Sequence, residues 1–155
     1  MLTVQKQEAA GKTVYTISGT IDEKTDLAKE LGTPTQPFVV VAKGITRINS
    51  VGVKNWIRFF STFGPKQIVF SFEQLSPTLV EQLNAIQNFN CGGTVNSIVM
   101  PYLCAGCKTE LIVPIKTADI VKLNNKVPDV KCPKCSGNAA FDEFPEEYFE
   151  FCSRG

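Results

Sequence analysis

A strand followed directly by a capped helix, within residues 38–63, is the sequence feature that most constrains the fold of this chain. It begins with Phe38-Val39-Val40-Val41, a continuous apolar run typical of a central strand that is buried on both faces. We expect residues 42–48 to form a short connector, after which Asn49-Ser50 supplies two good helix N-cap residues. Apolar residues then recur at the period of one helical face, at Val53, Trp56, Ile57 and Phe60. The pattern predicts a strand, a tight loop, and a helix whose N-terminus holds the Ser50 hydroxyl in solvent.

Strands and helices alternate on both sides of this unit, behind an N-terminal hairpin. The predicted elements are a hairpin over residues 2–17, a short helix opened by residues 19–22 and carrying Leu27 and Leu31, a strand over 67–72, a helix from Ser76-Pro77 to about residue 89, and a strand over 95–100. Alternation of this kind predicts an α/β fold. The expected sheet is mixed, mostly parallel with an antiparallel N-terminal edge hairpin, and packed with helices.

Composition and charge exclude several classes of function. Of the 155 residues, 43% are hydrophobic and 20% are charged, as in a soluble globular protein that can bury a core. The net charge of +1 argues against duplex DNA or an anionic membrane as a partner. The chain contains no histidine, so it lacks serine–histidine and cysteine–histidine nucleophiles, and we expect no enzyme activity. No apolar run reaches membrane-spanning length and the N-terminus is unlike a signal peptide, so a cytoplasmic protein with reduced cysteines is expected.

Two C-x-x-C pairs, Cys104-Ala105-Gly106-Cys107 and Cys132-Pro133-Lys134-Cys135, form the strongest chemical signal in the chain. The two-residue spacing lets a tight turn direct both sulfurs of a pair toward one ion, and two such pairs complete a tetrahedron. We therefore predict structural Zn²⁺ bound by Cys104, Cys107, Cys132 and Cys135, with no coordination position left for water or substrate. An iron centre of the rubredoxin type uses the same four thiolates and stays an alternative, as does a redox dithiol. The remaining cysteines, Cys91 and Cys152, are interpreted as small hydrophobic residues at helix ends.

The sequence pattern changes after residue 100, which predicts three parts. They are a body over residues 1–100, a zinc-ribbon segment over 101–140, and a short C-terminal helix over 141–155 that docks on the body. Within the ribbon, Ile120-Val121 is a strand candidate. In the C-terminal helix, Asp142 or Glu143 is the expected cap, ahead of Pro145 in the first turn. Its expected apolar face consists of Phe144, Tyr148 and Phe151.

The run from Val39 to Val53, VVVAKGITRINSVGV, resembles the signature of STAS domains, the anti-sigma-factor antagonist family. In that family a hydrophobic strand leads into a Gly-Val-x-x-Ile-Asp-Ser-x-Gly-Leu pattern at the start of a helix. Gly19-Thr20-Ile21-Asp22 is similar to a further family stretch, and the N-terminal hairpin and alternating strands and helices agree with the family's order of elements. The resemblance covers about residues 1–100 and implies a STAS-like fold in a bacterial-type regulatory protein.

The resemblance also implies a role for Ser50. In family members that act as anti-sigma antagonists, a partner kinase phosphorylates a hydroxyl at this step, and the phosphate breaks binding to the anti-sigma factor. We therefore expect a regulatory protein–protein interaction module, with an anti-sigma factor or a serine kinase as partner and Ser50 as the phosphorylation candidate. The chain departs from the family at Asn49, where an acid is usual, at Val51 and at Lys54. The predicted partner-binding surface consists of Arg47, Asn49, Ser50, Gly52 and Lys54.

Two other functions fit the residues alone. Nucleic-acid binding through the ribbon is supported by six lysines: Lys108, Lys116, Lys122, Lys126, Lys131 and Lys134. Exposed aromatic residues do not alternate with them, and the acidic C-terminal segment is expected to offset their charge, so nucleic acid is the less favoured partner. The other alternative is a scaffold without a switch, in which Asn49 or Ser50 only caps the helix.

Overall fold

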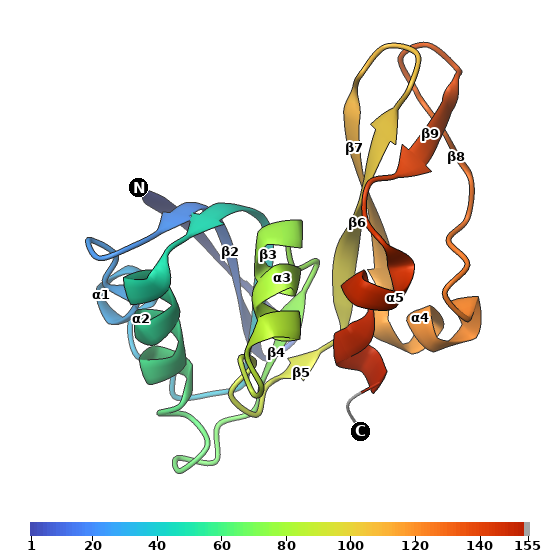
Figure 1. Ribbon diagram of the computed structural model, residues 1–155. Coiled ribbons are helices and arrows are strands. Elements are labelled where there is room, and N and C mark those ends of the chain that lie inside the picture. Colours follow the sequence, from blue (N-terminus) through green and yellow to red (C-terminus); the bar gives the residue numbers. More distant parts are fainter. Residues whose placement is uncertain (154–155) are drawn as a thin grey trace.

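The structure, a computed structural model, describes residues 1–153 and contains two sheets (Figure 1). The strands of the first sheet are β1 (Leu2–Ala9), β2 (Lys12–Ile21), β3 (Phe38–Ile48), β4 (Phe70–Glu73) and β5 (Thr94–Val95), in that spatial order. β1 and β2 form an antiparallel hairpin, and every later strand runs parallel to its neighbour. The connections are α1 (Leu27–Leu31), α2 (Ser50–Phe60) and α3 (Pro77–Ala85). The predicted α/β fold, with a mostly parallel mixed sheet and an antiparallel N-terminal hairpin, is confirmed.

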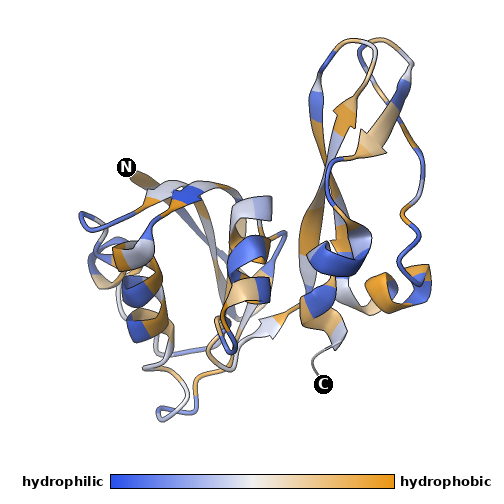
Figure 2. Ribbon diagram, in the orientation of Figure 1, coloured by the Kyte–Doolittle hydropathy of each residue, from blue (hydrophilic) through white to orange (hydrophobic). Residues whose placement is uncertain are grey.

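The central strands of the first sheet have one buried face and one partly exposed face. Along β3, Phe38, Val40 and Ala42 are buried, whereas Val39 and Val41 are partly exposed. The prediction that this strand is buried on both faces is therefore wrong, because the helices cover only one side. α2 and α3 stand in front of the sheet in Figure 1, and each carries both hydrophobic and hydrophilic residues in Figure 2, as expected of helices with one packed face.

Stacked aromatic rings join α2 to the buried face of the sheet. The indole of Trp56 stacks on the ring of Phe72 in β4 at 5.4 Å and on that of Phe89 at 5.1 Å between centroids. Its Nε1–H also donates a hydrogen bond of 3.0 Å to the carbonyl of Phe89. Trp56 and Phe60 are fully buried, while Val53 and Ile57 of the same predicted face are partly buried. The apolar face of α2 is thus the one that the sequence predicts.

The predicted connector over residues 42–48 is instead the second half of β3. It pairs in parallel with the end of β2, from Ser18 with Gly44 to Ile21 with Ile48, with two shifts of register. Residues 19–21, predicted to open a helix, accordingly belong to β2, and α1 begins only at Leu27, behind its cap Asp26. Burial of Ile45 in the core stabilises this extension, which local sequence patterns do not reveal.

The later elements of the body are shorter than predicted. β4 begins at Phe70 rather than at residue 67, because Gln67 adopts a left-handed conformation in the preceding turn. The helix start at Ser76-Pro77 is confirmed, and the Ser76 hydroxyl oxygen accepts a 3.3 Å bond from the Leu79 N–H. This helix ends at Ala85, ahead of the left-handed residue Asn88.

The second sheet is antiparallel and stands beside the first (Figure 1). Its strands are β6 (Ser97–Cys104), β7 (Glu110–Lys116), β8 (Val130–Lys131) and β9 (Asn138–Phe141), in the spatial order β7-β6-β9-β8. The remaining elements are α4 (Thr117–Leu123), α5 (Pro145–Tyr148) and a 3-10 helix, η1 (Glu150–Ser153). The predicted strand over 95–100 is divided at Asn96 into the end of β5, in the first sheet, and the start of β6, in the second. The predicted domain boundary between residues 100 and 101 lies within β6.

Hydrogen bonds join the second sheet and the C-terminal segment to the body. The N–H of Leu75, just beyond β4, donates to the Ser97 carbonyl at 3.3 Å, and the Val99 N–H donates back to the Leu75 carbonyl at 3.0 Å. The side chain of Asn84 on α3 donates to the Tyr148 carbonyl and accepts from the Phe151 N–H, each at 2.9 Å. The C-terminal helices therefore lie against α3.

Three local predictions for this half of the chain are wrong. Ile120 and Val121 lie in the helix α4, where Ile120 packs inward and Val121 is 71% exposed, an arrangement that suits one helical face. Neither Asp142 nor Glu143 caps α5, because Phe144 occupies the cap position and no side chain there bonds to the helix. Phe144 is 68% exposed and so does not belong to the buried face. Residues 154–155 of the predicted C-terminal segment lie outside the described residues.

Candidate metal centre and helix terminus

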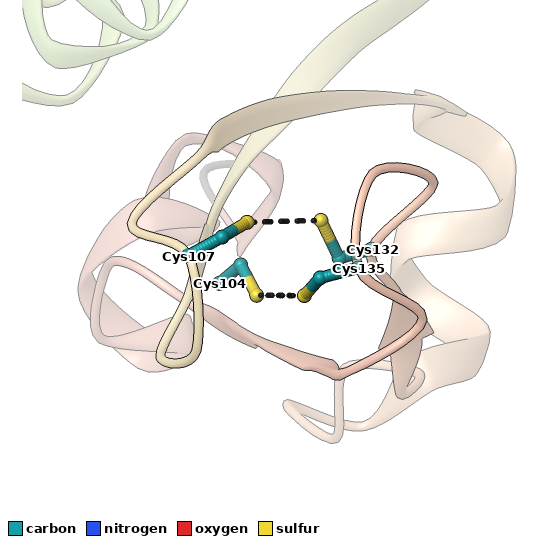
Figure 3. Close-up of side chains that lie close together, drawn as sticks. All are labelled: Cys104, Cys107, Cys132 and Cys135. Carbon is teal, nitrogen blue, oxygen red and sulfur yellow. Dashed lines mark hydrogen bonds between the residues drawn. The ribbon is translucent and has the colours of Figure 1, made fainter.

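The four cysteines of the C-x-x-C pairs converge at the far end of the second sheet (Figure 3). Cys104 ends β6 and Cys107 lies in the turn to β7, while Cys132 and Cys135 lie between β8 and β9. All four sulfurs lie within 4.8 Å of one another. The Cys104 and Cys135 sulfurs are 3.4 Å apart, and those of Cys107 and Cys132 are 3.5 Å apart. Four sulfurs bound to one zinc ion at about 2.3 Å would be roughly 3.8 Å apart, so the cluster is close enough to hold a metal ion.

The two pairs form turns of the same local structure. In the first turn the Cys104 N–H donates to the Thr109 carbonyl, and the Lys108 N–H donates to the Cys104 carbonyl. In the second turn the Cys132 N–H donates to the Gly137 carbonyl, and the Ser136 N–H donates to the Cys132 carbonyl. The two distances are 3.0 and 2.9 Å at Cys104, and 2.8 and 2.9 Å at Cys132. Each turn then reverses through a left-handed residue, Lys108 with φ of 62° and Ser136 with φ of 61°. This repeated turn is what directs both sulfurs of each pair toward the same point.

The electrostatics of the cluster favour a bound cation. The Thr109 hydroxyl lies 3.0 Å from the Cys107 sulfur and, with the backbone N–H of Thr109, lowers the pKa of Cys107 to about 6. The Gly137 N–H lowers the pKa of Cys135, but the neighbouring sulfurs, Cys104 first, outweigh it and raise that pKa to about 11. Four sulfurs this close repel one another when all are ionised, and a soft divalent cation removes that repulsion. The donor set and its spacing therefore fit a thiolate-bound metal.

The other two cysteines lie outside this cluster. The buried Cys91 sulfur is 3.5 Å from the Phe89 carbonyl, and burial raises the pKa of its thiol. Burial likewise raises the pKa of Cys152, in η1, to about 11. Within residues 1–153, the four-cysteine cluster is the one group of three or more Cys, Asp or Glu side chains close enough to share an ion. Cys91 and Cys152 are thus protonated packing residues at neutral pH.

Asn49 caps the helix that carries Ser50. Its Oδ1 accepts a 2.8 Å hydrogen bond from the Gly52 N–H, and its Nδ2 donates a 2.7 Å bond to Glu23 Oε2. Ser50 occupies the first helical position and is exposed. Of the two predicted cap residues, Asn49 alone therefore performs this role. The contribution of Glu23 could not be predicted, because it lies in another loop and no local pattern relates it to the cap.

The residues predicted to form a partner surface separate into two groups. Arg47, Ser50 and Lys54 are exposed, and Val51 between them is 44% exposed. Gly52 is buried, and a Cβ at this position would lie 2.1 Å from the carbonyl oxygen of Ile21. Its place in the predicted surface is therefore corrected: Gly52 lets the start of α2 approach the end of β2 and offers no side chain to a partner.

Comparisons with known proteins add no relative. No family model matches the sequence, and no curated protein is similar to it. Among the described residues, no helix is both long and apolar enough to cross a membrane.

Proposed function

We propose that this protein is a regulatory protein–protein interaction module of the anti-sigma-factor-antagonist type, with its binding surface at the start of α2. The observation that carries the proposal is the division of roles between Asn49 and Ser50. Since Asn49 provides the cap, the Ser50 hydroxyl is exposed, and within residues 1–153 no hydrogen bond to it is found. A kinase can reach this hydroxyl without unfolding the helix.

The charges around Ser50 support a switch. Arg47 and Lys54 contribute two exposed positive charges, with Val51 as an apolar contact between them. Glu23, which is bonded to Asn49, and Asp22 and Glu81, which line the same hollow as Arg47, carry negative charge beside them. A phosphate at Ser50 would add about two negative charges, which the N-terminal end of the helix dipole stabilises. The surface would then become more acidic, and an acidic partner group that contacts Arg47 or Lys54 in the unmodified protein would be repelled.

The four-cysteine cluster has a different role in this proposal. With four thiolates the coordination shell of Zn²⁺ is complete, so the ion supplies folding energy and no reactive position. The cluster lies at the end of the second sheet away from the body (Figure 1). We propose a structural zinc site there. Native mass spectrometry of the protein from its own cells would report zinc, iron and any phosphate together.

The Ser50→Asp variant tests the switch. It is expected to stay folded, since Ser50 is exposed and Asn49 keeps the cap, and to bind its partner at least about tenfold more weakly. Affinity capture from the native cell, followed by titration of the captured protein, measures the effect. Ser50→Ala should keep the partner, and Thr35→Asp places the same charge in an exposed loop elsewhere. Equal partner binding by all three variants would contradict the proposal.

One observation favours a second candidate, nucleic-acid binding by the second sheet. The acidic residues Glu143, Glu147 and Glu150 line one hollow together with Glu81 of α3. In Figure 1, α3 and α5 lie away from the turn between β6 and β7. This acidic group therefore lies apart from the exposed Lys108, whose near neighbour along the chain is the exposed Glu110. A salt-dependent mobility shift of labelled single-stranded RNA is the expected result if this role is real. A shift that is absent even at low salt excludes it.

A further inference from the structure

A cleft between α1 and the end of α2 combines an apolar floor with two positive charges. Its volume is about 480 Å³, within the range of roughly 300–1,000 Å³ that is usual for small-molecule sites. We propose that it binds a small amphipathic anion, that is, a phosphate or carboxylate attached to an aromatic or short apolar group. This site is separate from the partner surface, because Arg58 in the cleft lies eight residues along the helix from Ser50, or about 12 Å.

The floor and one wall of the cleft are apolar. Leu27 of α1 and Phe63, beyond the end of α2, are buried beneath it. The ring of Phe59 packs edge-on against that of Phe63, at 5.2 Å between centroids, and is itself partly exposed to the cleft. A partly exposed aromatic ring above a buried one offers a flat surface on which a ligand ring can stack.

The charge of the cleft is positive. Arg58 and Lys66 both line it, and neither forms an ion pair within the described part of the chain, where the only pair joins Lys122 and Asp119. The opposing charges are the carboxylate of Asp26, which also caps α1 by accepting from the Lys29 N–H at 3.1 Å, and the C-terminal end of the α2 dipole, equivalent to about half a charge. Two full cations outweigh them.

A ligand that matches this cleft therefore needs both of its features. An inorganic anion would meet the two cations but leave the aromatic floor in water. A neutral ring would bury that floor but leave the cations without a partner. A molecule with both parts gains from both interactions. Thr25, Thr33 and Thr62 also line the cleft, although the hydroxyls of Thr25 and Thr62 are already hydrogen-bonded within the protein.

A titration with three probes tests the proposal on the metal-bound, full-length protein. Phenyl phosphate is the complete probe, and inorganic phosphate and phenol are its two halves. We expect phenyl phosphate to shift the backbone NMR signals of Leu27, Phe59, Phe63 and Lys66, and to bind at least about tenfold more tightly than either half. Shifts scattered over the whole surface, or equal affinity for phenyl phosphate and phenol, would overturn the proposal.

Variants of the two cations complete the test. The Arg58→Gln, Lys66→Gln double variant is expected to fold normally, since both side chains are exposed, and to lose about tenfold in affinity for phenyl phosphate. Lys29→Gln is the matched control, because Lys29 is an exposed lysine of α1 that does not line the cleft. An unchanged affinity in the double variant, or an equal loss in the control, would show that the cleft does not recognise the anion.

Discussion

Removal of the proposed structural metal by a strong chelator, with the thiols kept reduced, is expected to unfold the outer half of the second sheet and leave the first sheet folded. Around the cluster the buried residues are few, mainly Cys104 and Cys132 themselves with Tyr102 and Ala139, and β8 is only two residues long. Structural zinc contributes about 10–16 kcal/mol in small zinc domains, which is more than this end of the sheet can lose and stay folded. The first sheet keeps its own aromatic core around Trp56.

Two measurements separate the halves of the molecule. Hydrogen exchange of the β8 and β9 amides reports on the metal end, and the emission of Trp56, the only tryptophan, reports on the first sheet. Cys132→Ser should behave like the chelated protein, and Cys152→Ser, outside the cluster, should keep its metal. Retained protection of β8 and β9 without metal would show that the cluster is not structural. A shift of Trp56 emission in step with their loss would show that the two sheets unfold together.

Replacement of Gly52 by alanine is expected to destabilise the protein by about 2 kcal/mol or more. An alanine in a helix normally gains about 1 kcal/mol over glycine. Here the added Cβ would lie 2.1 Å from the Ile21 carbonyl oxygen, a backbone atom that also accepts the Asn49 N–H at 3.3 Å. The clash must move the start of α2 away from the sheet. Overpacking typically costs about 1–3 kcal/mol, occasionally more, and because the clashing atom is backbone we expect a cost at or above the upper end, which leaves about 2 kcal/mol after the gain in propensity. Chemical denaturation measures the net change in the free energy of unfolding.

Gly64 provides the matched control for this substitution. A Cβ at Gly64 meets nothing within 4 Å, and its φ is not positive, so Gly64→Ala is expected to change stability by less than about 0.5 kcal/mol. If Gly52→Ala were equally neutral, α2 would have to be free to move outward. The buried position of Gly52, and its exclusion from the partner surface, would then be mistaken.

Local signals in the sequence predict the order of the elements well. The helical period in α2, the cap residues Asn49 and Ser76, and the N-terminal hairpin, which turns at Ala10-Gly11 in the structure, each depend on neighbours in the chain. The second half of β3 could not be predicted in this way. Its stability comes from pairing with β2, more than twenty residues earlier, and from burial of Ile45 in a core assembled from several elements.

In the candidate sites, too, features set by neighbouring residues can be predicted from the sequence and those set by distant residues cannot. The spacing of the cysteines predicts which sulfurs meet, because each pair is a local turn, although the four-sulfur cluster itself needs the β6–β9 pairing to bring the turns together. The exposure of Ser50 follows from its place beside a cap. The burial of Gly52 and the bond from Asn49 to Glu23 depend on where the end of β2 and its following loop lie, which no sequence pattern near residue 50 records.

The passage from β5 to β6 through Asn96 alone limits how the two halves can move. A linker of one residue allows little relative movement of the two sheets. Hydrogen bonds between Leu75 and both Ser97 and Val99, and between Asn84 and the C-terminal segment, restrict that movement further. The second sheet is therefore fixed rigidly to the body rather than joined to it by a flexible linker. The four-cysteine cluster and the start of α2 are thus held at one set distance and angle, so a partner that contacted both would have to match that spacing.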